Sequence, residues 1–358
     1  HKCDSIMADD INYLDRNEFN FEPSAEVVKA IKDFDVNKLC FYTRLYDEGK
    51  KSIFSIALAE DYGVDESQVV LGYGAEDILK QAVHFFLTET PGRNVMLIPQ
   101  YSWWYYQSIA DEVDGNTLQY SVNEEEDCFA YDFEALRRSI EEHRPKVVLV
   151  ASPNNPTGNG LTPDELDRLG QLTPTDTIIL VDEAYASFVT DNVSYIARLV
   201  GRYPNMIFCR TLSKFYGLPG LRMGFAFVGR SEEMDKFCRY ANKYLGYDRL
   251  AEDIAVAALS SEEHYRHVAA VMNEARRMYK EEIGRLQGFK VYRSVANFIL
   301  IKYPPALKDA LQRAFAQAHY KVKFMNEPGL ETHLRITLGR AKQNREVADV
   351  ILKIAQAQ

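Results

Sequence analysis

A lysine and an aspartate each follow a run of apolar residues, where a charged side chain needs a partner. Lys214 comes shortly after Met206–Cys209, and Asp182 comes directly after Thr177–Val181. A carboxylate at the end of a buried strand is costly unless something pairs with it. A surface lysine and a helix-capping aspartate are the ordinary alternatives. The residues around the lysine favour an anion-binding turn with a reactive amine: Arg210, Thr211, Ser213, Gly217, Gly220, Arg222 and Gly224.

Two other segments follow apolar runs in the same way. Gly72–Glu76 comes after Val69–Leu71, and Ser152–Gly158 comes after Lys146–Ala151. Small residues let the backbone approach a ligand, and a helix that begins there offers free N–H groups to an anion. A tight strand-to-helix turn would account for the glycines equally well. The second segment reads Ser-Pro-Asn-Asn-Pro-Thr-Gly, which is more specific than a plain turn requires.

Such segments can meet only if a sheet brings the strand ends together. The apolar runs do not alternate with polar residues, which is typical of strands buried on both faces of a parallel sheet. Amphipathic stretches separate them, as at Asp77–Leu87 and Pro163–Leu172, where Thr162 is a suitable cap. The sequence therefore predicts an α/β domain with ligands at the carboxyl ends of its strands.

Beyond about Arg230 the pattern changes to long charged helical stretches and two strand candidates. Glu262–Leu286 and Asn344–Ala355 are predicted helices, and Asn297–Ile301 and Leu334–Leu338 are predicted strands. The sequence therefore predicts a second, smaller α+β domain.

Composition excludes several classes of function. The chain has 358 residues and a formal net charge of -10, so it lacks the basic footprint of a nucleic-acid-binding protein. Its five cysteines are widely spaced without a CxxC pair, which predicts neither disulfides nor a metal site. No apolar run reaches the roughly 18 residues of a membrane span. We expect a cytoplasmic protein with reduced thiols.

Taken together, these segments resemble fold-type I pyridoxal-phosphate (PLP) enzymes of the class I and II aminotransferase group. Ser152–Gly158 resembles the asparagine loop of that group, Asp182–Tyr185 its pyridine-binding segment, and Ser213–Gly224 its lysine segment. The likeness extends over essentially the whole chain. It implies a large PLP-binding domain, with a mostly parallel seven-stranded sheet covered by helices, at 37–245. The smaller domain would combine an N-terminal segment, 1–36, with 246–358.

The resemblance also implies the roles of the residues around the cofactor ring. Lys214 would form the Schiff base and then move the substrate proton. Asp182 would keep the ring nitrogen protonated, so that the ring can withdraw electrons. Asn155 and Tyr185 would hydrogen-bond the ring oxygen, and Tyr101 would stack on the ring face.

The cofactor phosphate needs several donors, and the resemblance assigns them to three segments. The backbone at Gly74, Ala75 and Glu76 would bind it at a helix N-terminus. Side chains would add further donors: the hydroxyls of Thr211 and Ser213, and the guanidinium of Arg222. Tyr46 would reach the phosphate in the neighbouring subunit, which implies a homodimer with shared active sites.

Within this group the chain is most similar to the histidinol-phosphate aminotransferase branch. Leu14–Glu18 with Pro23-Ser24, Arg44–Asp47, Ser294–Phe298 and Leu334–Gly339 carry the likeness. It implies that Arg335 binds the substrate carboxylate and that Asn17 and Asn155 also contact the substrate. Lys323 stands where the branch usually has a phosphate-binding arginine, and Lys lacks the bidentate fork.

This departure leaves the second substrate open. The resemblance implies amino transfer between glutamate/2-oxoglutarate and histidinol phosphate/imidazole acetol phosphate, or a related aromatic or phosphorylated compound. The aromatic run Tyr101–Tyr106 either packs a helix or lines a pocket for such a ring. The alternatives are a decarboxylase of the threonine-phosphate type, an aromatic amino-acid aminotransferase, and a catalytically silent relative. The silent relative ranks last because the lysine and the aspartate are both present.

Overall fold

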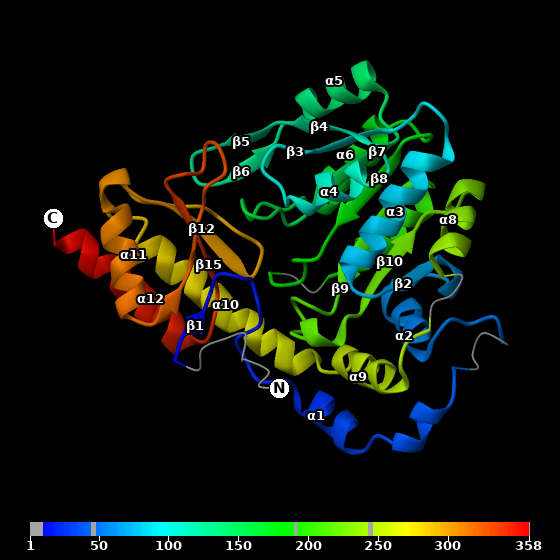
Figure 1. The fold of residues 1–358 in the computed structure, drawn as a ribbon, viewed down its shortest axis with the longest axis horizontal. Coiled ribbons are helices and arrows are strands. Elements are labelled where there is room, and N and C mark those ends of the chain that lie inside the picture. Colours follow the sequence, from blue (N-terminus) through cyan, green and yellow to red (C-terminus); the bar gives the residue numbers. More distant parts are fainter. Residues whose placement is uncertain (1–9, 44–47, 190–191, 243–245, 358) are drawn as a thin grey trace.

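The larger part of the molecule is a seven-stranded sheet between two layers of helices (Figure 1). The computed structural model describes residues 10–43, 48–189, 192–242 and 246–357. All strands of this sheet run parallel except β10, which lies antiparallel between β2 and β9. The mostly parallel α/β sheet predicted from the apolar runs is confirmed. The strand order is β2 (Val69–Gly72), β10 (Gly224–Val228), β9 (Met206–Thr211), β8 (Ile178–Asp182), β7 (Val147–Ala151), β3 (Val95–Pro99) and β4 (Asn116–Tyr120).

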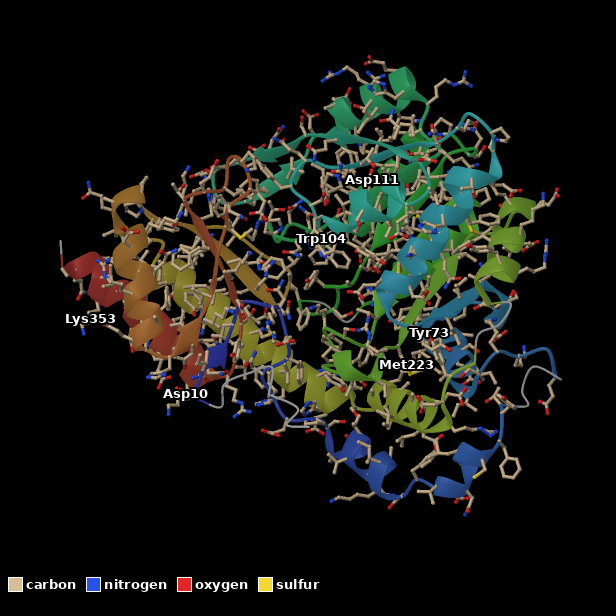
Figure 2. All side chains as sticks on the ribbon, in the orientation of Figure 1. Asp10, Tyr73, Trp104, Asp111, Met223 and Lys353 are labelled. Atoms are coloured by element: carbon tan, nitrogen blue, oxygen red, sulfur yellow. The ribbon has the colours of Figure 1, made fainter. Side chains whose placement is uncertain are left out.

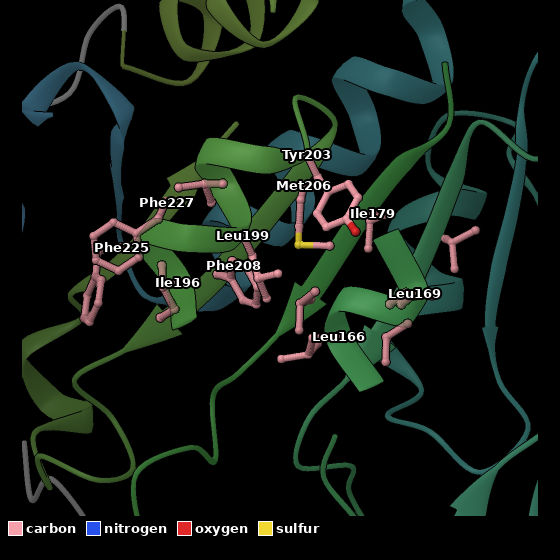
Figure 3. Close-up of a cluster of buried hydrophobic side chains, with 14 of the residues drawn as sticks. Leu166, Leu169, Ile179, Ile196, Leu199, Tyr203, Met206, Phe208, Phe225 and Phe227 are labelled. Carbon is pink, nitrogen blue, oxygen red and sulfur yellow. The ribbon is translucent and has the colours of Figure 1, made fainter. Parts of the chain in front are cut away.

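The central strands of the sheet are mostly apolar because each face of the sheet packs against its own layer of helices. Ile179 and Val181 of β8 enter one core, whereas Ile178 and Leu180 enter the other. Figure 3 shows side chains of β8, β9 and β10 packed with those of α6 and α7. The first core contains α2 (Ile53–Tyr62), α5 (Phe133–His143), α6 (Pro163–Leu172) and α7 (Ser194–Arg202). The second contains α3 (Ala75–Glu89), α4 (Tyr105–Asp111) and α8 (Glu232–Asn242).

The cap of α6 was predicted from the sequence, whereas three strands at the edge of the larger part were not. Thr162 caps α6 as expected, since its side chain accepts a hydrogen bond from the Glu165 N–H and Pro163 opens the helix. The strand β4 was not predicted because it is a half-exposed edge strand with Asn116, Thr117 and Gln119. The antiparallel hairpin of β5 (Val122–Glu124) and β6 (Phe129–Tyr131) was also missed.

The smaller part is an antiparallel sheet covered by three helices. Its core joins residues from both ends of the chain, because β1 (Asn12–Tyr13) pairs with β13 (Tyr320–Lys321) and Leu14 is fully buried. The strands are β11 (Lys290–Val291), β12 (Phe298–Lys302), β15 (His333–Thr337) and β14 (Lys323–Phe324), and the helices are α10 (Glu262–Glu282), α11 (Lys308–Gln317) and α12 (Ala341–Gln356).

The helix α1 (Ala25–Lys32) lies apart from this core and packs against α9 (Arg249–Leu259) through Val27, Ile254 and Ala258. The helix α9 also contacts α2 of the larger part. The predicted boundaries after residues 36 and 245 remain predictions. In the part of the chain that the structure describes, no helix is long and apolar enough to cross a membrane.

A buried ion pair supports the sheet behind the predicted lysine segment. Arg210 Nε donates to Glu183 Oε2 at 2.7 Å, and the two side chains are 6% and 2% exposed. The Tyr195 hydroxyl donates to the other Glu183 oxygen at 2.6 Å. Arg210 also donates to the hydroxyls of Tyr62 and Ser187, both at 3.1 Å. The charges are therefore balanced and hydrogen-bonded inside the core.

We predict that Arg210→Met lowers the free energy of unfolding by about 3–5 kcal/mol, because it leaves Glu183 buried without a countercharge. Urea unfolding of the cofactor-free protein measures the change. Arg230→Met is the matched control, since Arg230 and its partner Asp65 are 60% and 65% exposed. The control should cost less than about 1 kcal/mol. Equal losses in the two variants would contradict the importance of the buried pair.

Candidate active site

A cavity of about 680 Å³ lies where the ends of β8 and β9 face β14, β15 and the N-terminal segment. Trp104, labelled in Figure 2, lies between the large sheet and the small-domain strands and lines this cavity. Most of the predicted site residues line the same cavity: Asn17, Ala75, Glu76, Asn155, Asp182, Tyr185, Thr211, Ser213, Lys214, Arg222, Lys323 and Arg335.

Asp182 is the last residue of β8 and is only 5% exposed. Its Oδ1 accepts from the Ala184 N–H at 2.9 Å, and its Oδ2 accepts from the Tyr106 hydroxyl at 2.6 Å. Burial raises the pKa of this carboxyl group, and both hydrogen bonds oppose the rise. A buried carboxylate of this kind can hold a proton on a basic nitrogen in the cavity.

Lys214 extends from the segment after β9 toward the N-terminal segment. Its Nζ donates to the backbone oxygens of Asn17 at 3.2 Å and Arg16 at 3.4 Å. It also lies 5.4 Å from the centre of the Tyr185 ring. The Lys214 side chain therefore extends from the large sheet to the N-terminal segment, which is part of the smaller unit.

The third group is a set of anion donors at the start of α3. Gly74 precedes this helix of 15 residues, and Arg222 lies beside it. Arg222 donates to Glu76 Oε2 at 3.0 Å, so its guanidinium is held over the first turn. The Thr211 hydroxyl donates to Ser213 Oγ at 2.9 Å on the same side of the cavity. Free helix N–H groups, hydroxyls and a guanidinium form a donor set that suits a phosphate.

Arg335 on β15 joins the asparagine loop to the N-terminal segment. It donates to Asn155 Oδ1 through Nη1 and to the Asp15 backbone oxygen at 2.7 Å through Nη2. Its Nε is buried and has no hydrogen-bond partner among the described residues. Burial lowers the pKa of this guanidinium, and an anion in the cavity would supply what it lacks.

Asn17, which was predicted to contact the substrate, lines the cavity and is held by hydrogen bonds on both sides. Its Nδ2 donates to the Tyr185 hydroxyl at 3.2 Å, while its backbone N–H donates to Thr337 Oγ1 at 2.9 Å. Asn297 Nδ2 donates to its backbone oxygen at 3.0 Å. Asn17 therefore links β15 and the residue before β12 to Tyr185 on the cavity wall.

Three predicted residues are not on the cavity wall or cannot be placed. Tyr101 does not line the cavity, because its ring turns toward Phe129, 5.9 Å away. Trp103 lines the cavity instead, so the stacking role of Tyr101 remains a prediction without support from this geometry. Gly74 is not on the cavity wall, and its expected contribution is the backbone conformation that begins α3 before Ala75. Tyr46 lies outside the described residues.

The sequence alone did not identify every residue of the cavity wall. Trp103 and Trp104 both line it and also pack on Tyr105, so each alternative for the aromatic run holds in part. The hydrogen bond between Tyr106 and Asp182 was not predicted, because the two residues are 76 positions apart in the sequence. Arg16, Glu18, Met325 and Glu327 also lie on the wall. Among the described residues, no group of three or more His, Cys, Asp or Glu side chains is placed to hold a metal ion.

The family model described as "Aminotransferase class I and II" matches residues 9–351. The chain belongs to the class I and II aminotransferases. A histidinol-phosphate aminotransferase of Mannheimia succiniciproducens is 31% identical over 94% of this chain and 87% of that protein. This aminotransferase therefore has pyridoxal 5'-phosphate as its cofactor.

Two solved structures show the same fold. The histidinol-phosphate aminotransferase of Sinorhizobium meliloti, in complex with pyridoxal 5'-phosphate, has a TM-score of 0.80 at 20% identity, covering 96% of this chain and 91% of that one. The L-threonine-O-3-phosphate decarboxylase of Porphyromonas gingivalis has a TM-score of 0.77 at 20% identity, covering 97% and 100%. At these identities the likeness shows the fold alone.

We predict that Gly74→Ala weakens cofactor binding roughly tenfold, the effect of losing a hydrogen bond to a charged group. Gly74 has φ 88° and ψ 167°, which glycine alone adopts readily. An added Cβ would also approach Arg222 Nη2 to 2.7 Å, so the helix start and the arginine must move apart. Fluorescence titration of the cofactor-free protein with PLP measures the affinity.

Gly63→Ala is the matched control for this variant. Gly63 also has a positive φ, of 68°, but an added Cβ meets no atom within 4 Å in the described part of the chain. It should lose stability from backbone strain and keep its affinity for PLP. The same loss of affinity in both variants would show that strain, rather than the phosphate donors, causes it.

Proposed function

We propose that this aminotransferase moves an amino group between glutamate/2-oxoglutarate and a phosphorylated amine of the histidinol-phosphate type. The observation that carries the proposal is the register of β14 and β15. Lys323 is the direct partner of Arg335, and both residues line the cavity. Opposed residues of an antiparallel pair project from the same face. Two adjacent cations suit a phosphate dianion better than a single carboxylate.

Two tryptophans elsewhere on the cavity wall support an aromatic substrate. Trp103 and Trp104 line the cavity with ring centres 6.3 Å apart at an angle of 69°. Flat faces of this kind suit an imidazole or another planar ring. The similar protein of Mannheimia succiniciproducens has the same proposed activity in its name, which also favours this choice of substrate.

The remaining roles follow from the chemistry of each side chain. Bound pyridoxal phosphate supplies an aldehyde that captures amines and a ring that withdraws electrons. Lys214 would take the proton from the substrate α-carbon, since its amine lies in the cavity and would be free once the substrate amine has replaced it on the cofactor. Asp182 would hold a proton on the ring nitrogen, and Asn155 and Tyr185 would hydrogen-bond the ring oxygen. Ala75, Glu76, Thr211, Ser213 and Arg222 would bind the cofactor phosphate.

Two further parts of the proposal concern the assembled protein. We propose a cytoplasmic homodimer in which Tyr46 of one subunit completes the phosphate site of the other. Sedimentation of the purified protein tests the dimer. A mixture of Tyr46→Phe and Lys214→Ala subunits tests the sharing, because only a shared site gives the mixed dimer one wild-type site and an activity above that of either parent. Activity midway between the two parents would contradict the sharing.

We predict that Lys214→Ala abolishes turnover and leaves the unfolding midpoint of the cofactor-free protein nearly unchanged, because among the described residues its amine forms two hydrogen bonds to backbone oxygens and no ion pair. Wild-type protein loaded with PLP should have a visible absorption band that glutamate removes and 2-oxoglutarate restores. The variant should show neither change. A variant that still turns over would rule out Lys214 as the base. If glutamate leaves the wild-type band unchanged and the protein releases carbon dioxide from threonine phosphate, the decarboxylase is favoured.

We predict that Lys323→Ala raises KM for histidinol phosphate roughly tenfold, the effect of one hydrogen bond to a charged group. KM for glutamate should change little, because Arg335 remains. Lys323→Arg should keep the affinity. Lys302→Ala is the control, since Lys302 lies on the neighbouring strand β12 and does not line the cavity. Equal KM values for phosphorylated and unphosphorylated aromatic amines in wild-type protein would instead favour an aromatic amino-acid aminotransferase.

A further inference from the structure

Asp182 has a partner in the helical layer as well as in its own loop. The hydroxyl of Tyr106, on the first turn of α4, donates to Asp182 Oδ2 at 2.6 Å. The other oxygen accepts a backbone hydrogen bond from Ala184 and, among the described residues, no side-chain hydrogen bond. Tyr106 is therefore the side chain that fixes the rotation of this carboxylate. Both residues line the cavity, so one oxygen of the carboxylate is held while the group still faces the ligand.

The surroundings of the Tyr106 hydroxyl keep it protonated, so it remains a hydrogen-bond donor to Asp182. Its side chain is 3% exposed, and its ring packs edge-on against Trp103 with centres 5.9 Å apart. Burial, and next the neighbouring Asp182 charge, raise the pKa of this hydroxyl well above its usual value. The phenol therefore keeps its proton across the working pH range, and the hydrogen bond always points toward the carboxylate.

The other titratable groups near Asp182 do not replace this donor. Glu183 raises the pKa of Asp182, although Arg210 pairs with Glu183. Tyr131 of β6 donates its hydroxyl to the Ala151 backbone oxygen, and the thiol of Cys209 on β9 lies near Ala75 O. Burial raises the pKa of both groups, so both stay neutral. Lys214 and Tyr185 line the same cavity without a hydrogen bond to Asp182 among those of the described residues.

We propose that Tyr106 is a positioning residue that keeps Asp182 ionised and turned toward the ring nitrogen of the cofactor. This inference rests on the proposed function, in which Asp182 holds the proton on that nitrogen. Without the hydroxyl, burial disfavours the carboxylate form with less opposition. A carboxylate that is a weaker anion, and free to rotate, holds the ring proton less firmly. Tyr106 thus acts on the chemistry through Asp182 and need not touch the substrate.

Tyr106→Phe tests the inference, because it removes one oxygen atom and keeps the buried ring. In cofactor-loaded protein the pH midpoint of the visible absorption band should move upward by roughly half a pH unit. The reason is that a ring nitrogen that holds its proton less firmly withdraws less electron density from the imine formed with Lys214. The imine proton, which gives the visible band, is then lost at higher pH. Cofactor-free protein should bind PLP roughly tenfold more weakly. Turnover should show a lower kcat and a nearly unchanged KM.

Tyr120→Phe is the matched control for a lost buried hydroxyl. Tyr120 is 2% exposed and donates to the Leu149 backbone oxygen at 3.0 Å, so it does not contact Asp182. Its pH midpoint and PLP affinity should stay at the wild-type values. If the Tyr120 variant shifts as much as the Tyr106 variant, loss of packing accounts for both and the inference is overturned.

Asp182→Asn separates the inference from the proposed function. An asparagine should shift the midpoint further, and adding Tyr106→Phe to it should then change little, because the two residues act as one unit. Wild-type behaviour of Tyr106→Phe together with a shifted Asp182→Asn would overturn the role of Tyr106 and leave the proposed function intact. Wild-type behaviour of both would remove Asp182 from the cofactor ring. Additive shifts would also contradict a role through Asp182.

Discussion

The structure depends on a geometric constraint of parallel sheets, which end their strands on a common edge. The strands β3, β7, β8 and β9 run in the same direction, so their following segments share one side of the molecule. Asp182 and Lys214 come from two of these segments and line one cavity. The hydrophobic cores on both faces of the sheet hold the strands in register, and this packing fixes the positions of the residues at the strand ends. A site on such a scaffold needs few residues from its surroundings to be well placed.

Burial then decides how each charge near the cavity must be treated. Glu183 is neutralised by Arg210, whereas Asp182 next to it receives only neutral donors. Two adjacent carboxylates thus serve different purposes, because one is fully paired and the other retains capacity for a ligand. Arg335 likewise has two hydrogen bonds and one unpartnered N–H. Arg335 lines the cavity, so this N–H is placed where a ligand can reach it.

Local sequence was enough to predict the elements whose pattern is set by burial on both sides. The strands β7, β8 and β9 were predicted because short, continuous apolar runs are typical of strands covered on both faces, and the residues after them followed. The edge strand β4 was missed because half-exposed strands carry polar residues that are also typical of loops. Contacts of α4 were not predictable, since a helix of seven residues takes its orientation from packing. That orientation places Trp103 on the cavity wall, turns Tyr101 away, and brings Tyr106 to Asp182.

The reversed strand β10 has a consequence for how the site is built. Because it runs against its neighbours, its first residue, Gly224, pairs with Thr211 at the end of β9 and with Gly72 at the end of β2. The stretch from Thr211 to Arg222 is therefore one closed hairpin loop that starts and finishes at the ligand edge. Its lysine, hydroxyls and arginine therefore all come from one short loop, and the pairing of β9 with β10 fixes both ends of that loop. One extra residue in β10 would exchange the two faces of the strand.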